Sequence, residues 1–191
     1  MAKETEEKIR KDMRELDRQV KKRIQNALDA YDRYPGEQTM FGVFDEILFG
    51  YMFNVLCFVP IELTPDCGKV LIKTMYVPEQ LGHAYIMFTG MREAEDPTEA
   101  YAAMSYRIVL KHAAAEEGIV GIRINPGDRR QNLFISKENI GIIIRNGEEE
   151  TSGFLPEFRE KLEKYQVVDV ECGPGGRPLV DRKAENGDTA K

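Results

Sequence analysis

Tryptophan is absent from this sequence of 191 residues, and histidine and cysteine are scarce, with two and three copies. The histidines are His83 and His112, and the cysteines are Cys57, Cys67 and Cys172. None of them forms a CxxC motif, an HExxH motif or a close histidine pair, the spacings that bring metal ligands together, so we expect no metal site. An odd number of cysteines in unlike contexts argues against a disulfide framework and favours a reducing, cytoplasmic location.

Long apolar segments and an excess of positive charge are also lacking. The most apolar stretch, residues 40–60, is interrupted by Asp45, Glu46 and Asn54, whereas a membrane span needs about 20 mostly apolar residues. The first residues, MAKETEEKIRKDMRE, mix both signs of charge and have no apolar core of the kind that a secretory signal requires. A formal net charge of -6 argues against general nucleic-acid binding, which needs a cationic surface. We therefore expect neither a membrane nor a nucleic acid as a partner.

Recognisable catalytic motifs are missing as well. The sequence has no P-loop and no GxGxxG motif, and Ser105 and Ser136 have no nucleophile elbow around them. The acidic run from Glu148 to Glu150 lies near a predicted helix end, where solvated charge is the ordinary explanation. These absences predict a protein with no catalytic residue and no cofactor.

The residues that are present predict an α/β domain, with an α+β arrangement as the alternative. A hydrophobic content of 42% and a charged content of 31% are typical of a soluble domain with solvated helices. We expect a mixed β-sheet of about five strands flanked by helices. The predicted organisation is an N-terminal amphipathic helix over residues 1–36, an α/β domain over 37–172, and a disordered tail over 173–191, which is rich in glycine, proline and charge.

A narrow apolar stripe marks the N-terminal helix, with spacings of three and four residues that place its members on one face. The stripe can pack on its own domain, or it can pair with another chain as a short coiled-coil seam. It is therefore a candidate protein-contact surface, made of Ile9, Met13, Leu16, Val20, Ile24, Ala27 and Tyr31.

Further elements alternate in type along the chain. After Pro35 and Gly36, apolar residues cover most of a second helix, which predicts that it is buried on more than one side. Residues 56–63 and 69–77 predict a hairpin, and residues 83–89 a third strand.

The second half of the chain continues this alternation. The alanine-rich stretch after Glu99 predicts a helix that ends at Gly118, followed by a strand over 119–124. A helical crossover between such strands favours one parallel pair. Ser136 is a suitable N-cap for the next helix, and Asn146-Gly147 predicts its left-handed exit.

Four short segments together resemble the SseB protein family, specifically its N-terminal domain. They are FVP, YIMFTGM, GIRINPGD and ISKENIGIII, with Phe88-Thr89 and Ile124-Asn125-Pro126 as the most specific pieces. The resemblance covers residues 41–144 and implies an α/β fold without an established enzymatic activity or cofactor; the family is implicated by name in enhanced sensitivity to serine. This chain departs from the family pattern in its long charged N-terminal helix and in having no room for a full second SseB domain.

The best candidate ligand-facing edge lies where two predicted strands end. Asparagine, proline and glycine are the residues that any tight turn selects, but they also leave backbone amides open to a ligand. The adjacent arginine pair can bind a carboxylate or phosphate, or it can lie in a solvated loop. The candidate edge comprises Phe88, Thr89, Asn125, Pro126, Gly127, Arg129 and Arg130.

These observations favour a non-catalytic binding or regulatory module, of bacterial type, that engages a protein partner or associates with itself. One alternative is a small-molecule sensor or an unrecognised enzyme with a pocket near Asn125-Pro126. Another is a structural homo-oligomer held together by the N-terminal helix.

Overall fold

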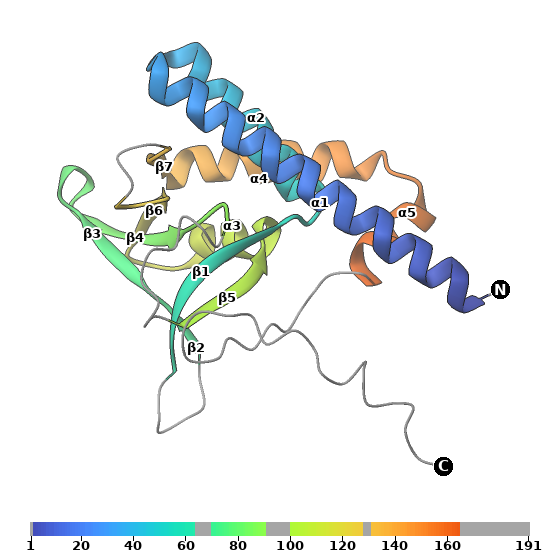
Figure 1. Cartoon of the computed structure of the whole chain (residues 1–191). Coiled ribbons are helices and arrows are strands. Elements are labelled where there is room, and N and C mark those ends of the chain that lie inside the picture. The colour runs from blue at the N-terminus through green and yellow to red at the C-terminus, as the bar shows by residue number, and fades with distance from the viewer. Residues whose placement is uncertain (1, 64–69, 91–99, 128–130, 165–191) are drawn as a thin grey trace.

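The computed structural model describes residues 2–63, 70–90, 100–127 and 131–164, and it confirms an α/β fold with a long N-terminal helix (Figure 1). Within these residues the helices are α1 (Ala2–Arg33), α2 (Glu37–Met52), α3 (Tyr106–Ala115), α4 (Lys137–Ser152) and α5 (Pro156–Lys164). The strands are β1 (Leu56–Leu63), β2 (Val70–Ile72), β3 (Thr74–Val77), β4 (Gly82–Met87), β5 (Ala100–Ser105), β6 (Ile119–Ile124) and β7 (Leu133–Ser136). The tail predicted over residues 173–191 lies outside the described residues.

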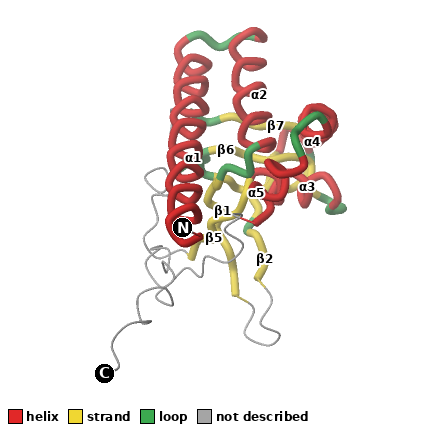
Figure 2. Tube along the Cα trace, turned by 90° about the vertical axis from the view of Figure 1, so that its right-hand side faces the viewer, coloured by secondary structure: helices red, strands yellow, loops and turns green. Residues whose placement is uncertain are grey.

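The first two helices form a hairpin whose turn lies at one end of the molecule, beyond the strands (Figures 1 and 2). α1 ends before Pro35, because proline has no N–H to continue the helical hydrogen bonds. α2 packs against α1, α3 and α4, and its residues Val43, Ile47 and Tyr51 are fully buried. This central position explains why apolar residues cover so much of the circumference of α2.

The described strands divide into two sheets, whereas the sequence predicted one sheet of about five strands. The first sheet has the order β2-β1-β5 and the second has the order β3-β4-β6-β7. β4 and β6 are parallel, which confirms the predicted parallel pair, and the remaining pairs are antiparallel. The chain leaves the first sheet at Lys73, between β2 and β3, and so the predicted hairpin strand over 69–77 contributes to both sheets.

A short bridge connects the two sheets. The N–H of Phe58 donates to the carbonyl of Phe88 at 2.9 Å, and the N–H of Phe88 donates to the carbonyl of Phe58 at 2.7 Å. Phe58 belongs to β1, and Phe88 directly follows β4. The sheets are therefore joined near the point where β4 ends, which is also the predicted ligand-facing edge.

The alanine-rich stretch is a strand, so the helix predicted there begins later than the sequence suggested. β5, Ala100–Ser105, pairs with β1 along its whole length. Alternate side chains, Tyr101, Ala103 and Ser105, are buried. Pairing and this two-residue alternation outweigh the helix propensity of alanine. α3 begins only at Tyr106, with Ser105 as its N-cap.

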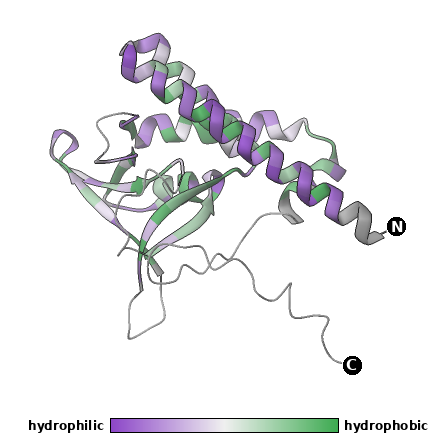
Figure 3. Cartoon of the chain, in the orientation of Figure 1, coloured by the Kyte–Doolittle hydropathy of each residue, from purple (hydrophilic) through white to green (hydrophobic). Residues whose placement is uncertain are grey.

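The exit predicted at Asn146-Gly147 was also wrong, because α4 continues through these residues to Ser152. The predicted start is confirmed, since the Ser136 side chain accepts a hydrogen bond from the N–H of Asn139. Figure 3 shows hydrophilic residues along the outward face of α1 and hydrophobic residues along β1 and β5. The core lies between the helices and the two sheets.

Candidate functional site

Two members of the predicted ligand-facing edge contact each other in the interior. The backbone N–H of Thr89 donates to Oδ1 of Asn125 at 3.0 Å, and Nδ2 of Asn125 donates to Oγ1 of Thr89 at 3.2 Å. Both residues have no exposed surface, and Phe88 beside them is also buried. The two predicted segments therefore do meet, but their polar groups form hydrogen bonds with each other.

The turn after β6 has the backbone conformation that its residues suggest. Asn125 has a φ of 45° and Gly127 a φ of 97°, values that asparagine and glycine tolerate better than other residues. Pro126 is half-buried and Gly127 is exposed. Arg129 and Arg130, the cations expected beside this turn, lie outside the described residues.

The stripe on α1 is used largely inside the chain. Its burial is greatest in the middle of the stripe: Val20 and Ile24 lie within the core, Leu16, Ala27 and Tyr31 are partly buried and pack against it, and Ile9 and Met13 are half-buried. A polar bond fixes the helix as well, because Oδ1 of Asp17 accepts the N–H of Leu56 at 2.8 Å. Val20 and Ile24 are thus inaccessible to a partner while α1 remains in place.

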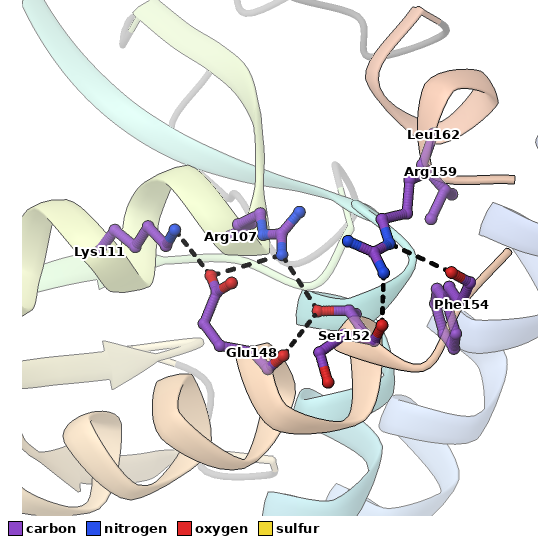
Figure 4. A pocket seen from close by; sticks show the side chains of 8 residues that line it. Arg107, Lys111, Glu148, Ser152, Phe154, Arg159 and Leu162 are labelled. Atoms are coloured by element: carbon purple, nitrogen blue, oxygen red, sulfur yellow. Dashed lines mark hydrogen bonds and ion pairs between the residues drawn. The ribbon is translucent and has the colours of Figure 1, made fainter. Parts of the chain in front are cut away.

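A pocket of about 350 Å³ opens between α3, α4 and α5, away from both predicted surfaces (Figure 4). Lys111, Arg107 and Glu148 gather at one end of it, and Phe154, Arg159 and Leu162 lie at the other. The lining residues are Arg107, Lys111, Glu148, Thr151, Ser152, Phe154, Arg159 and Leu162.

One oxygen of Glu148 is the focus of the charged end. Its Oε1 lies 2.7 Å from Nζ of Lys111 and 3.4 Å from Nη2 of Arg107, and it accepts a hydrogen bond from the hydroxyl of Tyr51 at 2.5 Å. The hydrogen bond from Lys111, and then that from Tyr51, lower the pKa of Glu148 to about 2. The same contact raises the pKa of Lys111. Glu148 is therefore held as a carboxylate among donors.

Three helices place these groups together. Arg107 and Lys111 lie one turn apart on α3, so they project from the same face. Glu148 comes from α4 and Tyr51 from α2, with Gly147 packed against the tyrosine ring. The Arg107 guanidinium lies 5.1 Å from the centre of that ring, within the range of a cation–π contact.

The apolar end of the pocket belongs to an aromatic cluster. Phe154 stacks on Phe53, the C-cap of α2, at 5.8 Å and meets Phe158 of α5 edge-on at 5.4 Å. Arg159 donates to the backbone carbonyls of Phe154, at 3.2 Å, and of Ser152. Because a cation stabilises the negative end of a helix, Arg159 acts as a cap for α4.

The chemistry that this lining supports is the holding of an anion. It contains no cysteine and no histidine. Cys57 lies elsewhere in the core, and burial raises its pKa to about 12, so it is a thiol at neutral pH. Within the described ranges, no three or more His, Cys, Asp or Glu side chains are grouped as metal ligands.

Sequence reasoning did not find this pocket. The prediction that Glu148 to Glu150 are solvated charge fits the exposure of all three residues, but the three donors around Glu148 were not predicted. The only local signal was the four-residue spacing of Arg107 and Lys111, which is common on solvated helices.

Comparison of the chain with protein-family models, with curated proteins and with solved structures finds no match. In the part of the chain that the structure describes, no helix has both the length and the apolar character needed to cross a membrane.

Proposed function

We propose that this protein is a non-catalytic binding module, and that the pocket between α3, α4 and α5 receives an acidic segment of a protein partner. The observation that carries the proposal is the convergence of Arg107 and Lys111 on a single carboxylate oxygen beside an apolar wall. Cationic donors of this kind recognise carboxylates through charge-assisted hydrogen bonds.

The charge balance of the pocket differs from that of the whole chain. Its lining has three cationic side chains and one carboxylate, a local balance of +2, whereas the chain has a formal net charge of -6. The partial negative charge at the C-terminus of α4 offsets part of this positive charge, because Arg159 donates to the carbonyl of Ser152 there. A positive pocket on an acidic protein attracts anions locally while the rest of the surface repels them.

The apolar part of the pocket restricts the kind of peptide that fits it. The half-buried Phe154 offers hydrophobic surface beside the cations, whereas Leu162 is almost fully buried, and a pocket of about 350 Å³ is near the lower end of the usual range for ligand sites. A peptide that carries an apolar residue close to an aspartate or glutamate matches both ends of this pocket. Such a peptide would bind through the apolar contact and the carboxylate together.

The other hypotheses receive less support. A ligand beside Asn125 and Pro126 would meet an Asn125 side chain that is buried and already bonded to Thr89. A homo-oligomer through α1 would have only the partly exposed members of the stripe available, because Val20 and Ile24 are buried. Membership of the SseB family stays a prediction from the motifs.

Selection of random peptides on the immobilised protein tests the proposal. We expect enriched peptides to contain aspartate or glutamate near an apolar residue, and to bind more weakly to the variant Lys111→Gln. Arg145→Gln is the matched control, because it removes the same charge from an exposed position on α4 that does not line the pocket. Enrichment without acidic residues, or equal loss of binding in both variants, would contradict the proposal.

A further inference from the structure

We propose that the Glu148 carboxylate occupies the binding seat in the free protein, and that the carboxylate of a partner displaces it from there. The seat consists of the donors on Tyr51, Arg107 and Lys111. This inference rests on the proposed function and adds to it a built-in competitor for the carboxylate of the partner.

Glu148 lies among three donors from two other helices, α2 and α3. Donors from α2 and α3 meet at Oε1, at 2.5 Å from the Tyr51 hydroxyl and 2.7 Å from the Lys111 ammonium. An exposed pair on α1, Glu15 with Arg18, instead joins neighbours within one helix. Glu148 thus shows which functional group these donors from separate elements accept.

Exchange of carboxylates is possible because the seat opens to solvent. The Glu148 side chain is 46% exposed and that of Lys111 is 51% exposed. Glu149 and Glu150 beside it are exposed as well. A displaced Glu148 carboxylate therefore moves into water, where it is solvated, and needs no opening of the core.

When Glu148 is displaced, another oxygen anion has to take its place as the acceptor for these donors. Tyr51 is buried, and leaving its hydroxyl without an acceptor is unfavourable. Arg107 contacts both Glu148 and Thr151 only at 3.4 Å, through Nη2, and its buried Nε has no hydrogen-bond partner. An incoming carboxylate that approaches Arg107 more closely gains hydrogen bonds that Glu148 does not make.

Competition by Glu148 weakens binding in the wild-type protein. Its effective concentration at the seat is high, because it is attached to the same chain. Removing its charge while keeping its shape, as in Glu148→Gln, frees the cations and leaves an amide oxygen for Tyr51. The variant is therefore expected to bind acidic ligands more tightly than the wild type.

The experiment is an NMR titration of the full chain with N-acetyl-glutamate N-methylamide, followed through the side-chain resonances of Arg107 and Lys111. We expect Glu148→Gln to bind about tenfold more tightly than the wild type, a difference of about 1.4 kcal/mol. Glu149→Gln is the matched control, since it removes the same charge one residue away, and its affinity should change by less than about twofold because exposed charges are screened. Backbone spectra of each variant verify the fold.

Two further arms complete the design. N-acetylglycine carries its carboxylate at a chain terminus, whereas the first probe carries it on a side chain. The probe that binds more tightly shows which of these two kinds of carboxylate the site takes. If Glu148→Gln and Glu149→Gln bind the probe with equal affinity and binding still requires Lys111, the displacement proposal is overturned while the proposed function stands. Absence of binding to every variant, or binding that Lys111→Gln leaves unchanged, would overturn the proposed function as well.

Discussion

Gly147 of α4 lies directly against the ring of Tyr51 of α2. A Cβ atom at position 147 would stand 2.4 Å from Cδ1 of Tyr51, closer than any real side-chain contact. The absence of that atom lets α4 approach α2, and the tyrosine hydroxyl then lies 2.5 Å from Oε1 of Glu148. This helix contact therefore sets the position of the Tyr51 hydroxyl relative to Glu148.

Replacing Gly147 by alanine should destabilise the protein. Overpacking in a core typically costs about 1–3 kcal/mol, and we expect a loss in that range by urea denaturation. Gly141 on the same helix is the control, because a Cβ there meets nothing within 4 Å. Gly141→Ala should stabilise by roughly 0.5–1 kcal/mol through helix propensity. A loss of stability in both variants would show that the Tyr51 contact is not the cause.

The Thr89 and Asn125 pair should be energetically coupled. Removing the Thr89 hydroxyl leaves the Nδ2 of Asn125 without its acceptor, and removing the Asn125 side chain breaks both bonds, so each change leaves a buried polar group unpaired at a cost of about 1–3 kcal/mol. We use Thr89→Val and Asn125→Gly, because glycine keeps the positive φ of Asn125 accessible. The double variant should lose less than the sum of the single losses, by about 0.5 kcal/mol or more. Strictly additive losses in chemical denaturation would mean that the two residues act independently.

Alkaline pH should weaken the fold through Cys57. Burial raises the pKa of its thiol from 9.0 to about 12, so the folded state keeps a proton that the unfolded state has released. Stability therefore falls as the pH rises from 9.0 toward 12, by at most about 1.4 kcal/mol per pH unit. Burial also raises the pKa of Tyr51 and Tyr85, which act in the same direction.

The comparison that isolates the thiol is with Cys57→Ala. This variant should start from a lower stability and decline less steeply in the same alkaline range. Parallel declines of the two proteins would exclude Cys57 as a source of the pH dependence.

Acid should weaken the fold through Glu148. Its pKa is lowered from 4.5 to about 2 by Lys111 and Tyr51, so its stabilising contribution is present above pH 4.5 and is lost as the pH falls toward 2. Because the side chain is 46% exposed, solvent screening limits this contribution to about 1 kcal/mol or less. Glu148→Gln should show a smaller loss over that range than Glu149→Gln in urea titrations. Identical acid profiles would mean that the donors do not stabilise the ionised carboxylate.

Local signals in the sequence predicted much of the fold. The strand over 56–63 has its predicted bounds, and Ser136 caps α4 as its side chain suggested. The parallel pairing of β4 with β6 followed from the helix between them. These features depend on neighbouring residues or on chain direction, and both can be inferred from one sequence.

Features that depend on distant partners were not predictable in this way. β5 is a strand because β1 pairs with it, although its alanines favour a helix. Gly147 resembled a helix exit because its packing partner, Tyr51, lies far away in the sequence. The pocket combines Arg107 and Glu148 from different helices, and no spacing in the sequence indicates that they meet.

The most direct test of the acidic-ligand site is a backbone amide map of the protein titrated with N-acetyl-glutamate N-methylamide. We expect chemical-shift changes concentrated on α3, α4 and the start of α5, strongest around Lys111 and Thr151, and reduced in Lys111→Gln. Changes centred on Thr89 and Asn125, or on the N-terminal part of α1, would contradict it.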